Sequence, residues 1–323
     1  MSGVDIERII RRRRRNDVLF ALTGATITAA VLLVLGALAF TLVREGVSRL
    51  DLDFLRSYPS RRAERAGLLP AWVGSLLVML VTGLTGIPLG IAAGVYLEEY
   101  TRKGWFASII ELNITNLAGV PSIVYGLMAL GLFVYRFHLG PSVIAAGLTL
   151  ALLVLPIVIV ATRETLKSIP QNMREAAYAL GATRWQVVRH HLLPYSAGGI
   201  STGVIIAMSR AIGETAPLIA IGAVAFVAFL PPVPYSADAF AVAREWAGSE
   251  QLSVVEAAVY PGVAWLGTSF TVVPIQMFNW ISRPGDDFRA NVAAAGIVLI
   301  VATIGLNAVA ILIRHRMRRR IKW

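Results

Sequence analysis

Long apolar runs dominate this chain and limit it to folds that a lipid bilayer can surround. Hydrophobic residues make up 56% of the 323 residues and charged residues only 15%, whereas soluble proteins carry about a quarter charged residues. Six runs are long enough to cross a bilayer as a helix, which takes about 20 residues. They lie at about residues 18–43, 72–97, 112–135, 142–161, 197–228 and 292–313. The sequence therefore predicts an all-α polytopic membrane protein with six transmembrane helices.

Basic residues are concentrated at both ends of the chain and predict its orientation. The formal net charge is +11, and clusters at Arg11 to Arg15 and Arg314 to Lys322 flank the first and last apolar runs. If both termini are cytoplasmic, the cytoplasmic segments hold 19 of the 30 lysines and arginines, and the external segments hold 10. Cytoplasmic loops of membrane proteins usually carry such an excess of basic residues. The flanking position favours contact with anionic membrane lipid over binding of nucleic acid. We therefore expect a multi-pass protein of the cytoplasmic (inner) membrane.

The domain organisation follows from these spans. We expect a cytoplasmic basic arm (1–17), one transmembrane domain (18–313) and a cytoplasmic basic tail (314–323). A long external connection then covers residues 229–288. Its segment 252–278 is apolar enough to suggest a seventh span, but it contains Glu256 and two prolines, and a seventh crossing would put the basic ends on opposite sides of the membrane. This segment is predicted to be an external amphipathic or re-entrant element.

The composition excludes several kinds of active site. The chain has no cysteine, and its four histidines do not form the His-Glu-x-x-His pattern of a zinc site. No Gly-x-x-x-x-Gly-Lys-Ser/Thr loop occurs, so the chain lacks that means of holding nucleotide phosphates. We therefore expect no catalytic residue, no metal and no cofactor in this chain.

Two of the apolar runs contain residues that disturb a helix. The second run carries Gly86, Gly90 and Gly94 on one face, which predicts close packing against a neighbouring helix, and Pro88 is expected to bend or interrupt it. The third run opens with NITNLAGVPSIVYGL, whose Gly-Val-Pro stretch predicts a break. Lipid cannot satisfy the backbone groups that a break frees, so this segment is predicted to lie inside the bundle.

An ion pair is predicted within the fifth apolar run. Its sequence SRAIGETAPL places Arg210 and Glu214 four residues apart, on one helix face. An ionisable side chain at mid-span costs about 2.5–3.5 kcal/mol, and such residues pair with each other or face a pathway. Two interpretations stay open: a structural pair buried between helices, or an arginine that presents its planar fork to an oxyanion while Glu214 holds it. Pro217 could open the helix near this site.

A charged, amphipathic stretch, REAAYALGATRWQVVRHHLLP, occupies residues 174–194 between two apolar runs. Ala176, Ala177, Leu180 and Val187 are expected near one face, with Arg174, Glu175, Arg184 and Arg189 elsewhere around the helix. Gly181 can end a first helix, and Thr183 can cap a second one. We expect two short helices outside the membrane.

This stretch resembles the EAA loop of the membrane subunits of bacterial ABC importers. Glu-Ala-Ala at 175–177, Gly181 and Leu193-Pro194 match the pattern, whereas His191 stands where an aliphatic residue is usual. The resemblance implies a type I ABC-importer permease architecture, with 163–194 as a cytoplasmic loop that couples to a separate ATPase subunit. The residues expected to mediate this coupling are Arg174, Glu175, Ala176, Ala177 and Gly181.

Three further motifs resemble those of phosphate-specific ABC permeases, and the last two of them resemble the PstA type. They are PSIVYG in the third run, SRAIGETAPL in the fifth and FNWISRP before the last. The resemblance implies import of inorganic phosphate by alternating access. It also implies two ATPase copies, a PstC-type permease partner forming a heterodimer, and an external phosphate-binding protein.

The same resemblance implies that Arg210 and Glu214 lie on the phosphate pathway. Arg163 matches another basic position of the family, where it could serve the pathway or anchor the inner end of its span. Another oxyanion, such as sulfate, molybdate or phosphonate, suits an arginine equally well. An ATP-independent channel or an intramembrane enzyme is the alternative from a different class.

Overall fold

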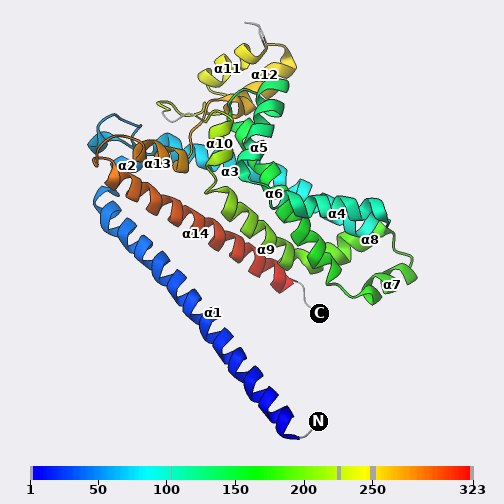
Figure 1. Cartoon of the computed structure of the whole chain (residues 1–323). Coiled ribbons are helices and arrows are strands. Elements are labelled where there is room, and N and C mark those ends of the chain that lie inside the picture. Colours follow the sequence, from blue (N-terminus) through cyan, green and yellow to red (C-terminus); the bar gives the residue numbers. More distant parts are fainter. Residues whose placement is uncertain (1–2, 103, 224–226, 248–251, 321–323) are drawn as a thin grey trace.

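The computed structural model describes residues 3–102, 104–223, 227–247 and 252–320 (Figure 1). Within these ranges the chain is helical and contains no strand. Lys103 and the outermost residues of the predicted arm and tail lie outside the described residues. The main helices are α1 (Gly3–Gly46), α2 (Leu52–Arg56), α3 (Leu69–Val95), α4 (Trp105–Leu117), α5 (Ser122–Ala129), α6 (Val143–Lys167), α7 (Gln171–Ala179), α8 (Arg184–Val187), α9 (Leu193–Ala211), α10 (Ala216–Ala220), α11 (Ala237–Ala247), α12 (Val254–Val263), α13 (Val273–Ile281) and α14 (Arg289–Arg320).

Five helices of the described chain are long and apolar enough to cross a membrane, and α4 with α5 makes a sixth if this bent pair is one span. The predicted all-α fold is therefore confirmed, and the six predicted spans correspond to these five helices and the bent pair. The spans belong to α1, α3, α6, the α8–α9 helix and α14.

Helix α1 stands apart from the bundle and touches it mainly at its C-terminal end (Figure 1). At 1.5 Å per residue, its 44 residues extend about 66 Å, twice the hydrocarbon thickness, so the arginine-rich arm continues the first span as helix. Its last residue, Gly46, packs so closely on α14 that an added Cβ would come within 2.6 Å of the backbone of Ala294.

Helices α3 and α6 form the centre of the bundle and pack in parallel. The three α3 glycines meet α6 in chain order: Gly86 at Val154, Gly90 at Val158 and Gly94 at Thr162. A Cβ added at any of them would come within 2.9 Å of these side chains, which confirms the predicted close-packing face. The helix runs through Pro88 without interruption, so of the two predicted effects only a bend stays open. Neighbouring helices commonly support a proline within a membrane span, and α6 lies directly against this turn.

The predicted break in the third span is present, but its predicted position inside the bundle is wrong for this chain alone. Helices α4 and α5 meet at a 105° bend, and Ala118, Gly119 and Pro121 at the bend are exposed. One freed backbone group is satisfied locally, because the N–H of Val120 and the hydroxyl of Tyr125 both donate to the Leu117 carbonyl, at 3.1 and 2.8 Å. The helices of this chain therefore do not supply the cover that the sequence predicts for this bend.

No seventh span forms in the described part of the connection between α10 and α14. Helix α12 has ten residues and begins with Ser253 and Glu256 in a capping box. The short 3-10 helix η6 (Ala264–Gly267) and a non-helical stretch separate it from the nine-residue α13. The backbone N–H of Ser253 donates to the Glu256 carboxylate and lowers its pKa. The start of α13 is buried on α3, where the Ser75 hydroxyl accepts a hydrogen bond from the N–H of Val273 at 3.0 Å. The prediction that residues 252–278 form no seventh span is confirmed, and their place as an external amphipathic or re-entrant element stays a prediction.

Figure 1 shows the elements sorted between two ends of the molecule. The start of α1, the end of α14 and helix α7 lie towards one end, and α2, α11, α12 and α13 lie towards the other. This arrangement agrees with an even number of crossings.

Candidate functional site

Helices α7 and α8 form a tight helix–turn–helix at one end of the bundle. The turn after α7 is closed by two hydrogen bonds, from the N–H of Gly181 to the Tyr178 carbonyl at 2.9 Å and from the N–H of Ala182 to the Ala177 carbonyl at 3.1 Å. This is the Schellman pattern, and Gly181 has the positive φ, +83°, that it requires. The prediction that Gly181 ends the first helix is confirmed.

Thr183 begins the second helix, as predicted. Its hydroxyl accepts the N–H of Gln186 at 3.3 Å, and the Gln186 side chain accepts the N–H of Thr183 at 2.7 Å, so the two form a capping box. Helix α8 then continues through a π-helical turn, η5 (Val188–Leu192), directly into α9. The second short helix is therefore the beginning of the fifth span.

The inward face of α7 differs from the predicted one. Ala177 and Val187 are buried as expected, in an apolar cluster at the ends of α3 and α6. Ala176 is exposed, and Leu180 is 90% exposed, so their predicted place on that face is wrong. Leu180 caps the helix end after α7 has stopped, and its direction follows the turn. Glu175 is exposed beside Ala176.

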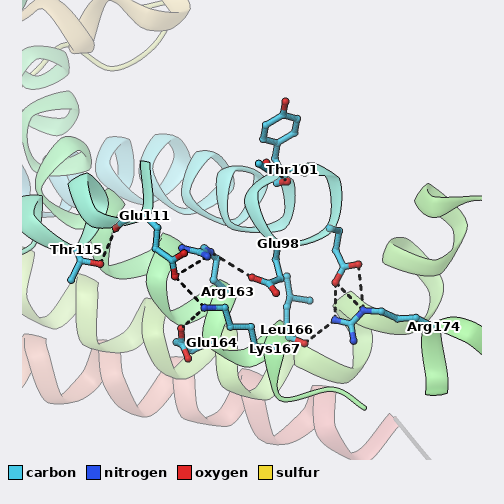
Figure 2. A network of polar contacts seen from close by, with 11 residues as sticks. Glu98, Thr101, Glu111, Thr115, Arg163, Glu164, Leu166, Lys167 and Arg174 are labelled. Carbon is cyan, nitrogen blue, oxygen red and sulfur yellow. Dashed lines mark hydrogen bonds and ion pairs between the residues drawn. The ribbon is translucent and has the colours of Figure 1, made fainter. Parts of the chain in front are cut away.

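Arg174 shares the buried face of α7, although the pattern placed it elsewhere around the helix. Its Nε and Nη2 donate to the Glu99 carboxylate at 3.1 and 2.7 Å, as a two-pronged ion pair (Figure 2). Its Nη1 donates to the Ile169 carbonyl and its Nη2 also to the Leu166 carbonyl, both at 2.9 Å. The side chains of Arg174 and Glu99 are 9% and 7% exposed. Arg174 therefore points into the protein, away from any partner that docks on α7.

Arg163 lies in a second ionic cluster next to the first (Figure 2). Its Nη2 is 3.0 Å from the Glu111 carboxylate of α4, and its Nε is 3.6 Å from Glu98. Lys167, one turn further along α6, contacts both Glu111 and Glu164 at 3.2 Å. Three carboxylates thus surround two cations, which gives this cluster a surplus of negative charge. Such surroundings suit an anchor that ties α4 and α6 together.

Arg210 and Glu214 form the predicted pair, but at the end of a helix. Helix α9 stops at Ala211, so the predicted continuous span to residue 228 is wrong; residues 224–226 of it lie outside the described residues. The Nε of Arg210 is 3.4 Å from a Glu214 oxygen, and the two side chains are 44% and 17% exposed. Arg210 therefore lies open on the surface of the isolated chain, while Glu214 beside it is largely covered.

The segment after this pair explains why α9 ends there. Pro217 lies in the first turn of α10, where a proline starts a helix, and so does not open one from within. Helix α10 packs on α5, since an added Cβ at Gly126 would come within 2.6 Å of Pro217. The chain must turn away from the α9 axis to make this contact.

Arg163 and Arg210 are not brought together. Helices α6 and α9 pack antiparallel. The contacts that fix their register are Gly199 with Thr165 and Gly203 with Ala161. Extended along the helices, this register places Arg210 nine residues from Arg163, or about 13 Å along the axis. The two arginines therefore belong to different levels of the bundle.

Sequence reasoning missed most partners in the two ionic clusters. No sequence motif singles out Glu98, Glu99, Glu111 or Lys167. The available signal was their position at the ends of apolar runs, where ionisable groups usually pair. In the part of the chain that the structure describes, no group of three or more potential metal ligands occurs.

Comparison with known proteins places the chain in a family. Residues 86–323, well over half of the chain, match the family described as binding-protein-dependent transport system inner membrane component. The chain belongs to this family. It is thus a transport subunit of an ABC importer in the inner membrane, and works with a separate ATPase subunit and a binding protein.

Relatives of the phosphate permease type support the resemblance drawn from the motifs. Over 213 residues the chain is 39% identical to the phosphate transport system permease protein PstA of Yersinia pestis, covering 64% of this chain and 70% of that protein. Over 181 residues it is 41% identical to PstA of Haemophilus influenzae, covering 56% and 64%. The PstA-type resemblance is confirmed.

A solved structure supports the architecture. An inward-facing structure of the MetNI methionine ABC transporter superposes with a TM-score of 0.52 at 17% identity and covers 76% of this chain and 93% of that one. At this identity the likeness concerns the fold alone, and it agrees with the predicted ABC-permease architecture.

Proposed function

We propose that this chain conducts inorganic phosphate through an ATP-driven importer by alternating access, with Arg210 on the pathway. The observation that carries the proposal is the open position of Arg210 at the break between α9 and α10. Within the described residues only its Nε contacts Glu214, so both terminal amino groups are available to an oxyanion. A guanidinium fork matches two oxygens of a phosphate, and Glu214 holds the fork in place.

The choice of phosphate rests on the relatives. Two PstA proteins whose names refer to phosphate transport share 39% and 41% identity with this chain. The arginine itself would suit sulfate, molybdate or phosphonate equally well, because each presents oxygens to the same fork.

The exposed face of α7 and α8 supports a docking site for the ATPase. Glu175 and three large side chains of this segment are exposed: Tyr178 (42%), Leu180 (90%) and Trp185 (56%). Apolar side chains that protrude from a charged segment outside the spans mark an interaction surface. ATP-driven movement of two ATPase copies would reach the permease here.

The uncovered surfaces of the chain support a second permease of the PstC type as its partner. Both the α4–α5 bend, at residues 118–121, and Arg210 are exposed in the isolated chain. Non-helical backbone at membrane depth persists only where protein covers it or water fills a cavity. A heterodimer would enclose both features and create the pathway between its halves, with an external phosphate-binding protein delivering the substrate.

The charge distribution supports a cytoplasmic location for both termini. The start of α1, the end of α14 and helix α7 lie towards one end of the molecule (Figure 1). The predicted cytoplasmic segments at this end hold 19 of the 30 lysines and arginines.

The test is phosphate uptake by proteoliposomes that contain the complete importer with its binding protein and internal ATP. We expect ATP-dependent uptake of labelled phosphate. An excess of sulfate on the order of tenfold, enough to reveal a shared site, should leave this uptake unchanged. Strong inhibition by sulfate would redirect the proposal to another oxyanion. Uptake without ATP would favour a channel and refute it.

A further inference from the structure

The buried pair of Arg174 and Glu99 has no place in docking the ATPase or in binding phosphate. It joins α7 to the π-helical turn η3 (Tyr96–Tyr100) that extends α3. Arg174 also bonds the carbonyls of Leu166 and Ile169 at the end of α6. One side chain therefore fastens α7 to the ends of both central helices.

We propose that Arg174 and Glu99 form a clamp that makes α7 move as one body with α3 and α6. This inference rests on the proposed coupling role of α7 and adds the route by which its movement reaches the transmembrane helices. Arg174 acts as a positioning residue, because it touches neither phosphate nor the docking face.

The geometry favours a rigid link. All three guanidinium nitrogens of Arg174 are occupied, with distances to Glu99, Leu166 and Ile169 between 2.7 and 3.1 Å. A planar fork bound on several sides fixes direction as well as distance, which a lysine cannot do. Among the described residues, this is the only ion pair between α7 and another element.

The remaining attachments of α7 are less directional. Ala177 and the half-buried Met173 contribute apolar contacts to the cluster beneath the helix. On the far side, the turn at Gly181 leads into α8. Without the clamp, α7 could shift over this apolar surface and lose its fixed angle to α6.

The turn η3 also connects the clamp to a third helix. Glu98, next to Glu99, faces Arg163 of α6, and Arg163 pairs with Glu111 of α4 (Figure 2). On this one turn, Glu99 thus binds Arg174 of α7, and the adjacent Glu98 contacts the ionic cluster between α4 and α6. Movement of α7 would reach α3 and α6 directly, and α4 through this second cluster.

The experiment compares Glu99→Gln, Arg174→Gln and the double variant in the reconstituted importer. Glu99→Gln keeps the size of the side chain and Arg174→Gln shortens it, and both remove the charge pairing. We expect intact assembly and continued ATP hydrolysis, with phosphate imported per ATP reduced about tenfold or more, as the loss of a charged hydrogen bond implies. The double variant should be no worse than the single ones, since both break the same link.

Glu99→Gln keeps the test informative even if Arg174→Gln fails to fold, because it leaves Arg174 bonded to the carbonyls of Leu166 and Ile169. The matched control is Arg289→Gln, which breaks the exposed ion pair with Asp286 far from α7 and should leave phosphate per ATP unchanged. Unchanged phosphate per ATP in assembled Glu99→Gln and Arg174→Gln would overturn the clamp.

A distance measurement separates failure of the clamp from failure of the proposed function. Spin labels on cysteines at Arg102 and Ala179, both exposed in a chain without native cysteine, report the position of α7 relative to the end of α3. In the parent importer we expect one narrow distance with and without ATP, and in Glu99→Gln a broad distribution. Equal widths in both would overturn the clamp, even if the importer carried an anion other than phosphate.

Discussion

Replacing Gly181 tests whether the turn between α7 and α8 couples ATP hydrolysis to transport. Gly181 has φ of +83°, and a Cβ added there would meet no atom within 4 Å. A substitution is therefore opposed by backbone conformation alone, with no contribution from crowding. The left-handed conformation costs a residue with a Cβ about 1–2 kcal/mol. This lowers the population of the native turn about 5- to 30-fold.

A series of substitutions at this position grades the strain. Asparagine adopts positive φ readily, alanine less so and the β-branched valine least. We expect phosphate uptake per ATP to fall in the order glycine, asparagine, alanine, valine, with normal membrane insertion throughout. The assay measures uptake and ATP hydrolysis in the same proteoliposomes.

The chain offers a matched control for this series. Gly285, in the connection before α14, also has a positive φ, +93°, and free space around its Cβ position. Gly285→Val imposes the same kind of strain far from α7, and we expect it to leave uptake per ATP unchanged. If assembled Gly181→Val transports as well as Gly285→Val, the turn is not part of the coupling element.

Three further predictions concern the pathway, the packing and the topology. Arg210→Met with Glu214→Leu should cost no more than about 1 kcal/mol in stability, since Arg210 is 44% exposed and both charges are removed together, yet reduce uptake about tenfold or more. Near-normal uptake by the assembled double variant would contradict the pathway role. Gly90→Ala should lower the free energy of unfolding, measured by thermal denaturation, by about 1–3 kcal/mol, because its Cβ would come 2.7 Å from a side chain of α6. Gly36→Ala, whose Cβ would meet no atom within 4 Å, should leave this free energy unchanged or raise it. A cysteine at the exposed Ser282 should react with an impermeant maleimide in intact cells, and labelling only after permeabilisation would reverse the assigned orientation.

The sequence by itself determined the features that depend on neighbouring residues. Apolar runs of span length became the long helices, because lipid leaves a backbone no alternative to internal hydrogen bonds. Gly181 and Thr183 end and begin helices through bonds that reach no further than five residues. The glycine face of α3 followed from helical spacing alone, since close approach requires only the absence of side chains.

Only the tertiary structure decided which polar residues meet. Arg174 turned inward because Glu99, 75 positions earlier in the sequence, lies beside it in the fold. Helix α9 ends at Ala211 and α10 packs on α5, and the α4–α5 bend lies on the surface because no other helix of the described chain covers it. Helical periodicity predicts the face on which a side chain lies, but the free energy of burying a charge depends on a partner that distant parts of the chain supply.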